Sequence, residues 1–243
     1  MSQRQPKTVV ILQPSYLPWL GYFAQMEQSD VFVVYDDVQY DKESWRNRNR
    51  IKSQQGVQWL TVPALTKGEN WPTNRDIRIN NAVNWRRKHL NALRLNYSKA
   101  PFFLDYFSSF EELLSEDFEH LFDLNMASLK LLTKLLGLKR EILLSSDLKI
   151  EGSSTERLVD ICRHLFASRF YEGAAGRNYM NCVAFEQADI ELVFQDYQHP
   201  RYPQLHGAFV PHLSIVDLLF NCGPQSLSIL SEQTPAGTLP LPE

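Results

Sequence analysis

The stretch that most constrains the fold runs from Val9 to Arg50 and reads VVILQPSYLPWLGYFAQMEQSDVFVVYDDVQYDKESWRNRNR. An apolar run at Thr8–Leu12 precedes a turn rich in proline and aromatic residues, and a second apolar run covers Val31–Tyr35. Between them, apolar side chains recur at roughly helical spacing. The pattern predicts two buried parallel strands joined by a helical crossover. The polar residues that follow both strands would meet at one edge of the sheet, where open α/β sheets bind ligands.

The rest of the chain continues this alternation and predicts an α/β fold, with a mostly parallel Rossmann-like sheet flanked by helices. Further strands are expected at 57–62, 75–79, 141–144, 169–171 and 190–195. Helices are expected at 85–97, within 102–136 up to a C-cap at Gly137, and at 153–166, 179–187 and 214–220. We therefore expect a single α/β domain over residues 1–243, divided into an N-terminal α/β half (7–81), a helical insertion (82–140), a C-terminal α/β half (141–232) and a loose tail (233–243).

Composition narrows the classes of partner. Lys and Arg number 25 against 28 Asp and Glu, a net charge of -3, so no global field attracts nucleic acid, and none is expected as a partner. No run approaches the ~20 apolar residues of a membrane span and the start lacks a signal-peptide core, so we expect a cytoplasmic protein without membrane insertion. The three cysteines lack CxxC spacing and no HExxH occurs, so no metal site is predicted.

Two adjacent carboxylates, Asp36 and Asp37, follow the second strand. Neighbouring side chains on an extended backbone point to different sides, so one would face a cleft and the other would brace a loop. The inward carboxylate could bind an amine or sugar hydroxyls, hold Mg²⁺ with substrate phosphates, or act as a general base. A turn after a strand is the alternative without function, since Asp is common in turns.

Alternating arginines and asparagines follow this pair. In an extended loop, Arg46, Arg48 and Arg50 would project together and suit a phosphate or carboxylate, whereas a helix start would bring Asn47 close to Arg50. A solvated arginine run is the alternative. The candidate binding residues of this half are Gln13, Tyr16, Trp19, Gln39, Tyr40, Arg46, Asn47, Arg48, Asn49 and Arg50, although Trp19 fits a core position as well as a stacking one.

The C-terminal third adds three candidate segments. Thr155 and Arg157 lie at a predicted helix N-terminus, which suits an anion, although ordinary capping explains the hydroxyls equally well. Gly173 and Arg177 belong to a glycine-containing loop that matches neither the Walker pattern nor GxGxxG. The loop from His199 to His212 is rich in candidate acids and bases; a positioned histidine contributes about 10²–10⁴-fold to a rate. We assign a role in proton transfer to His199. Substrate binding is assigned to Tyr202, Gln204 and His212.

Several longer motifs resemble one known family. They are QPSYLPWLGYF at 13–23, DDVQY at 36–40, NRNRI at 47–51, WLTVP at 59–63, GAAGRNY at 173–179, HPRYPQ at 199–204 and LSIVDLLFNCG at 213–223. Together they are similar to the WbqC-like protein family over nearly the entire chain. That resemblance implies a setting in O-antigen and other surface-polysaccharide gene clusters, and it implies transfer of glycine or another acyl group to a sugar.

The N-terminal turn also resembles the layout of HxGH nucleotidyltransferases. Gln13-Pro14 enters the turn, and WLGY at 19–22 stands where the two histidines of that class would be. Those imidazoles stabilise phosphate charge in the transition state. Their replacement by aromatic residues puts nucleotidyl transfer in doubt, although the fold and the nucleotide-binding corner would be shared.

Three functions remain open from the sequence. The leading one is a transferase of surface-polysaccharide biosynthesis that moves an acyl or aminoacyl group onto a nucleotide-linked amino sugar. Arg46, Arg48 and Arg50 would hold the diphosphate, Asp36 or Asp37 the amine or hydroxyls, and His199 would deprotonate the amine. The others are a nucleotidyl or adenylyl transferase, and a noncatalytic sugar-nucleotide binding protein. No motif specifies a cofactor; a nucleotide with Mg²⁺ is the candidate.

Overall fold

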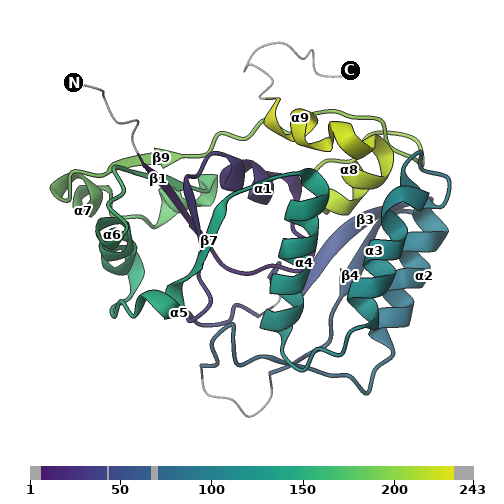
Figure 1. Ribbon diagram of the computed structural model, residues 1–243, viewed down its shortest axis with the longest axis horizontal. Coiled ribbons are helices and arrows are strands. Elements are labelled where there is room, and N and C mark those ends of the chain that lie inside the picture. Colours follow the sequence, from purple (N-terminus) through teal and green to yellow (C-terminus); the bar gives the residue numbers. More distant parts are fainter. Residues whose placement is uncertain (1–6, 43, 67–70, 233–243) are drawn as a thin grey trace.

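A five-stranded parallel sheet stands at the centre of the computed structural model, which describes residues 7–42, 44–66 and 71–232 (Figure 1). Its strands are β1 (Thr8–Leu12), β2 (Val31–Val34), β7 (Glu141–Leu144), β8 (Arg169–Glu172) and β9 (Glu191–Phe194). They lie in the order β7-β2-β1-β8-β9, and each neighbouring pair is parallel. The predicted Rossmann-like α/β fold is confirmed. The tail expected at 233–243 lies outside the described residues.

Both faces of the central strands are buried, which explains their nearly continuous apolar sequence. Alternate residues of β1 and β2 join two different cores. One core includes α6 (Ser154–His164) and α7 (Cys182–Gln187), and the other includes α1 (Leu20–Glu27). The first core receives Val9, Ile11, Val31 and Val33, and the second receives Val10, Phe32 and Val34.

The order of the strands creates a switch point between β1 and β8. From β1 the chain crosses by α1 to β2 and later adds β7 on the same side, then returns to place β8 and β9 on the other side. Because connections leave β1 and β8 in opposite directions, their carboxyl ends leave a crevice between them. This is the edge at which the sequence predicts polar residues to collect.

Three long helices are inserted between β2 and β7 in the chain, as the sequence predicts. They are α2 (Trp85–Tyr97), α3 (Phe103–Ser115) and α4 (Leu121–Leu136), which stand beside the sheet in Figure 1. The helical spacing at 102–136 belongs to two helices, because Glu116 is extended and ends α3. Gly137 caps α4 in the left-handed region at φ 70°, as expected for a glycine C-cap.

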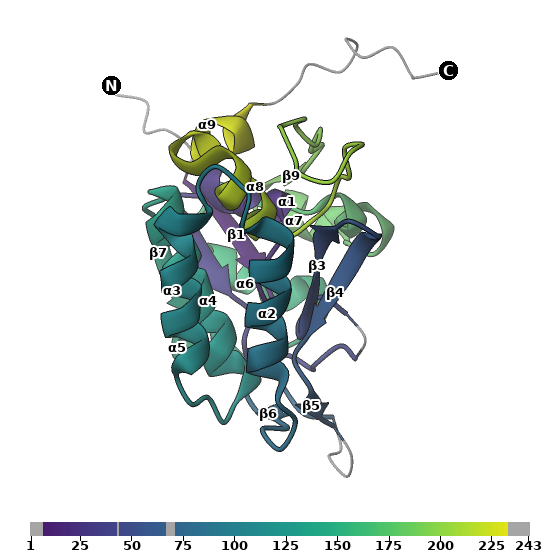
Figure 2. The same ribbon diagram turned by 90° about the vertical axis from the view of Figure 1, so that its right-hand side faces the viewer.

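An antiparallel hairpin accounts for a second group of predicted residues and corrects two expectations. It consists of β3 (Arg48–Ser53) and β4 (Gly56–Thr61), and it is separate from the main sheet (Figure 2). The strand expected at 57–62 therefore exists but does not extend the parallel sheet. Arg48 and Arg50 lie in strand β3, whereas Arg46 lies in the turn before it, so the segment is not a helix start. A second pair, β5 (Ala64–Leu65) and β6 (Arg78–Ile79), has two residues in each strand.

Short elements complete the chain. They are α5 (Ser145–Leu148), α8 (Ile215–Cys222), α9 (Ser226–Ser231) and 3₁₀ turns at Ala174–Asn178 and Gly223–Gln225. Ser214 caps α8, because its Oγ accepts a hydrogen bond from the Val216 amide at 3.3 Å. Within the described ranges, no helix has both the length and the apolar character needed to cross a membrane.

Candidate functional site

A cavity of about 680 Å³ opens at the carboxyl ends of β1, β2 and β8, on the switch point of the sheet. Gln13 lines it from the end of β1, Asp37 from beyond β2, and Glu172 from the end of β8. Arg46 and the first turn of α6 also line it. Of the residues that the sequence singles out, the cavity brings together Gln13, Asp37, Gln39, Arg46, Thr155 and Arg157.

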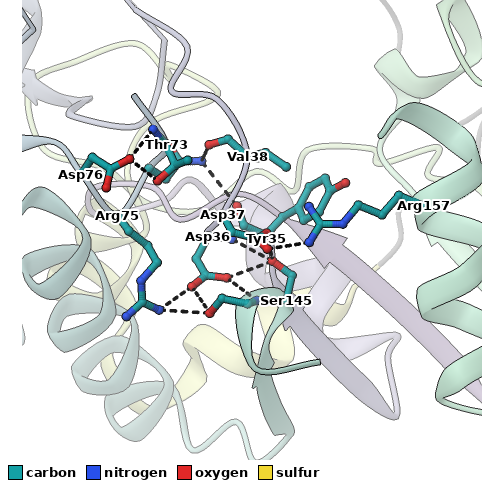
Figure 3. A network of polar contacts seen from close by, with 11 residues as sticks. Tyr35, Asp36, Asp37, Val38, Thr73, Arg75, Asp76, Ser145 and Arg157 are labelled. Atoms are coloured by element: carbon teal, nitrogen blue, oxygen red, sulfur yellow. Dashed lines mark hydrogen bonds and ion pairs between the residues drawn. The ribbon is translucent and has the colours of Figure 1, made fainter. Parts of the chain in front are cut away.

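The two aspartates after β2 have different surroundings. Asp36 is fully buried, and its carboxylate accepts hydrogen bonds from Arg75 Nη1 at 2.7 Å, Ser145 Oγ at 2.9 Å and Ser146 N at 3.0 Å. Figure 3 shows Arg75 and Arg157 approaching the aspartate pair from opposite sides. Burial alone would raise the pKa of Asp36, but these hydrogen bonds outweigh it and hold the pKa below its usual value. Asp36 does not line the cavity, so it braces a loop and lacks the contact that a catalytic role requires.

Asp37 points to the cavity and is held in place by two partners. Its Oδ2 accepts a hydrogen bond from Arg157 Nη2 at 2.5 Å, and its Oδ1 accepts one from Ser145 Oγ at 2.6 Å. Arg157 in turn lies over the Tyr35 ring, 5.1 Å from its centroid, and donates Nε–H to the Ile150 carbonyl at 2.9 Å. Burial would lower the pKa of Arg157, but the bond with Asp37 and the nearby Tyr35 raise it. This pair is therefore a rigid, internally neutralised wall of the cavity.

Two arginines, Arg46 and Arg157, line the cavity. Arg157 pairs with Asp37, whereas Arg46 has no carboxylate within ion-pair distance among the described residues. Its Nη1 donates to Ser15 Oγ at 2.8 Å, while its buried Nε has no hydrogen-bond partner. Burial lowers the pKa of Arg46, and the nearby Tyr22 and Asp41 offset only part of that effect. An anion in the cavity would supply the missing compensation.

The first turn of α6 forms the opposite rim. Its first amides have no acceptor within the helix, and the helix dipole is positive at this end. The Ser153 side chain makes no capping hydrogen bond, and Thr155 Oγ1 accepts instead from the Asn181 amide at 3.2 Å. Ordinary side-chain capping therefore does not explain these hydroxyls, and the rim is suited to a phosphate.

Glu172 is the functional candidate that the sequence interpretation missed. It ends β8, is 7% exposed, and accepts a hydrogen bond from Tyr179 Oη at 3.2 Å. Burial raises the pKa of Glu172 to about 7, and the bonds from Tyr179 and the Gly173 backbone offset only part of that effect. A carboxyl group with a pKa near neutrality can accept and release a proton at physiological pH.

The glycine-containing loop after β8 makes room for this carboxyl group. A Cβ atom on Gly176 would lie 2.4 Å from Glu172 Cγ and 3.1 Å from Phe194 Cε1. The loop therefore leaves room for the Glu172 side chain. Arg177 stacks on Phe194 at 4.9 Å, and Gly173 faces Gln25, so neither of these predicted binding residues lines the cavity. The sequence did contain a signal for Glu172: it is a glutamate at the end of a predicted strand, directly before the GAAG segment.

His199 lies outside the cavity, in an aromatic cluster that comprises Trp19, Tyr197, His199, Tyr202, Phe209 and His212. Its ring centroid is 5.2 Å from that of His212 and 5.7 Å from that of Phe209. Burial is the main reason why the pKa of His199 is lowered to about 4; the hydrogen bond with the Pro200 carbonyl opposes this effect, and the nearby His212 adds to it. The proton-transfer role expected for His199 is therefore not supported by its position.

Trp19 occupies a packing position within this cluster. Its indole ring covers Gly21, where an added Cβ would lie 2.1 Å from Trp19 Cη2. The ring also packs against His212 and Tyr197, at centroid distances of 5.3 and 5.6 Å. The position of the first HxGH histidine is thus occupied by a side chain directed away from the cavity lining.

The remaining predicted binding residues also lie outside the cavity, because each is engaged in holding the fold. Gln204 exchanges two hydrogen bonds with the Val210 backbone, and Arg50 donates to the His212 carbonyl at 2.8 Å. Buried packing, backbone hydrogen bonds or stacking on tryptophan account for Tyr16, Tyr40, Asn47, Arg48 and Asn49. The expected fork of three arginines is therefore divided: Arg46 faces the cavity, and the other two belong to the hairpin.

Metal ligation has little support in the donor set. No group of three or more His, Cys, Asp or Glu side chains suited to a metal occurs in the part of the chain that the structure describes. Mg²⁺ can be held by one or two carboxylates together with substrate phosphates. Both oxygens of Asp37 already accept hydrogen bonds, and Glu172 is partly protonated near pH 7, so the fit is poor.

Comparison with known proteins places the chain in one family. The sequence model of the WbqC-like protein family matches residues 13–229. A protein of Mycobacterium tuberculosis strain H37Rv, named as the uncharacterized protein Rv1507c, is 38% identical over 222 residues, which cover 90% of this chain and 96% of that protein. No solved structure matches the chain.

Proposed function

Because the chain belongs to the WbqC-like protein family, we propose that its cavity binds a nucleotide-linked amino sugar and transfers an acyl or aminoacyl group to the sugar amine. The observation that carries the proposal is the meeting, at one switch point, of Arg46 and Glu172. One supplies an incompletely compensated positive charge, and the other a carboxyl group that titrates near neutrality. The implied setting is the synthesis of a surface polysaccharide.

The diphosphate of the substrate would lie between Arg46 and the first turn of α6. Arg46 offers its Nε and a fork of N–H groups, and the helix offers amides and the positive end of its dipole. Charge-assisted hydrogen bonds of this kind contribute about 1.5–3 kcal/mol each. Asp37, fixed by Arg157, would accept hydrogen bonds from the sugar hydroxyls or the amine.

Glu172 would accept the proton of the attacking amine. The amine nitrogen forms a bond with the acyl carbonyl carbon of an activated donor such as a thioester, and the carbon–sulfur bond of the donor breaks. Glu172 takes the proton lost by the nitrogen and returns it to the departing thiolate. Tyr179 orients the carboxyl group through its hydrogen bond to Oε1. The rate would therefore rise with pH through about 7, because only the ionised form of Glu172 can act as a base.

The test is a direct assay of group transfer. Purified protein is incubated with UDP-linked amino sugars and a panel of acyl and aminoacyl thioesters, and the sugar nucleotide is followed by mass spectrometry. The proposal predicts a mass gain equal to the acyl group with at least one pair. Binding of the UDP-linked sugars without any mass gain would leave the noncatalytic binding function as the better account.

Nucleotidyl transfer is less well supported by the cavity. No histidine lines it within the described residues, and the residue at the first HxGH position packs on Gly21. Release of pyrophosphate from ATP or CTP in the presence of Mg²⁺ would nevertheless favour this function over acyl transfer. The same incubation can be scored for both products.

A further inference from the structure

Two tryptophans lie side by side on the outer face of the β3–β4 hairpin. Trp45 and Trp59 are 40% and 45% exposed, their ring centroids are 5.4 Å apart, and their planes are inclined by 32°. In β4 the exposed Val57 and Trp59 alternate with less exposed residues, and Leu60 is buried in the core. Because the two rings are in contact, they form a continuous exposed apolar patch, which is a feature of interaction sites.

Two arginine side chains make cation–π contacts with these rings. The Arg50 guanidinium lies 5.2 Å from the Trp45 ring centroid and 5.8 Å from that of Trp59, and Arg48 lies 4.8 Å from the Trp59 ring. Arg50 is also fixed by its hydrogen bond to the His212 carbonyl at 2.8 Å. We call Trp45, Arg48, Arg50, Val57 and Trp59 the Trp–Arg surface. It combines flat apolar rings with two ordered positive charges.

The Trp–Arg surface begins one residue away from the cavity. Trp45 and Arg46 are consecutive, so their Cα atoms are about 3.8 Å apart, and Arg46 lines the cavity while Trp45 packs on Trp59. The carbonyls of both residues are held by the Tyr16 amide, at 3.3 and 3.2 Å. A ligand longer than one sugar could therefore extend from the cavity onto the hairpin.

We propose that the Trp–Arg surface binds an acidic oligosaccharide. The apolar C–H faces of the sugar rings would stack on Trp45 and Trp59, and the sugar carboxylates would pair with Arg48 and Arg50. A nucleic acid would offer rings and negative charge as well, but a sugar chain is favoured because the surface begins beside Arg46, which lines the cavity proposed to hold a nucleotide-linked sugar. The inference rests on the proposed function, for which the surface would hold the glycan part of a sugar substrate.

The test uses the full-length chain and three probes: tetragalacturonate, maltotetraose and a dT8 oligonucleotide. Indole N–H resonances, assigned by Trp→Phe variants, are followed during each titration. Tetragalacturonate is expected to shift the resonances of Trp45 and Trp59 and to leave that of the buried Trp85 in place. Trp59→Ala should weaken this binding about tenfold. Trp71→Ala, a matched control at a residue 78% exposed, should not change it.

Other results would overturn the inference. They are the absence of shifts at Trp45 and Trp59 with tetragalacturonate, equal binding of neutral maltotetraose, and tighter binding of dT8. If Trp59→Ala does not fold, Trp45→Ala provides the same comparison from the turn before β3. Arg46→Ala separates the two proposals: it should weaken UDP binding in the cavity and leave tetragalacturonate binding intact, so either proposal can fail while the other stands.

Discussion

The cavity and the aromatic cluster around His199 both gather side chains that could perform chemistry, but they do so in different surroundings. In the cavity, Arg46 and Glu172 border about 680 Å³ of open space. In the cluster, aromatic rings surround His199 and keep its imidazole neutral, with a pKa of about 4. Residue type alone therefore does not distinguish the two regions. Position at the carboxyl ends of adjacent parallel strands makes the cavity the candidate site.

The largest expected difference between the two regions concerns the rate of group transfer. Glu172→Gln should reduce the rate of group transfer by about 10²–10⁴-fold, the usual contribution of a positioned acid or base. UDP-sugar binding should persist, because glutamine keeps the shape of the side chain. The matched variant His199→Gln should stay within about twofold of the parent. A larger loss in His199→Gln than in Glu172→Gln would reverse the assignment.

Glu172 should also leave a signature in stability, independent of any substrate. Folding raises the pKa of this carboxyl group from 4.5 to about 7, so the folded state binds its proton more tightly than the unfolded state does. Its ionisation therefore destabilises the folded state progressively between pH 4.5 and 7. Glu172→Gln should be more stable than the parent at pH 8 by up to about 3 kcal/mol, a gain that disappears below pH 4.5. Urea unfolding at several pH values measures this, and a gain independent of pH would contradict it.

The next largest effect is expected on the affinity for UDP, when Arg46 is replaced. Arg46→Ala should weaken UDP binding by about 10–100-fold, since it removes charge-assisted hydrogen bonds to phosphate. Arg177→Ala is the control, because that side chain stacks on Phe194 outside the cavity. Isothermal titration calorimetry measures both affinities. Equal affinities for the two variants would place the phosphate site elsewhere.

The smallest effect compares the adjacent aspartates. Asp36→Asn should lower the free energy of unfolding by about 2 kcal/mol, because buried hydrogen bonds from Arg75, Ser145 and Ser146 lose their charged acceptor. Asp37 is more exposed, so Asp37→Asn should cost about 1 kcal/mol or less. Urea unfolding at pH 7 distinguishes them, and a larger cost for Asp37→Asn would contradict the division of roles.

The sequence predicted the parallel core well because each strand is short, apolar and bounded by turn residues. Val9–Ile11 and Val31–Val34 are buried, and their continuous apolar runs indicate this burial in the sequence. The aspartate pair was also interpreted correctly in one respect, since one carboxylate was expected to brace a loop. Alternation of side chains along an extended backbone was enough for that inference.

The chemistry at the site depended on long-range packing that local patterns do not report. Glu172 resembles an ordinary strand-end glutamate until Phe194 and the loop at Gly176 enclose it. His199 resembles an accessible base until Phe209 and His212 pack around it. The arginine run was divided because Arg48 and Arg50 pair in a hairpin, whose partner strand was assigned to the main sheet.

A crystal structure with UDP-N-acetylglucosamine bound would show whether the cavity is the substrate site. We expect the diphosphate between the Arg46 guanidinium and the first turn of α6, with the sugar directed toward Glu172 and Asp37. Binding beside His199 and His212, with the cavity at the ends of β1, β2 and β8 left without ligand, would contradict it.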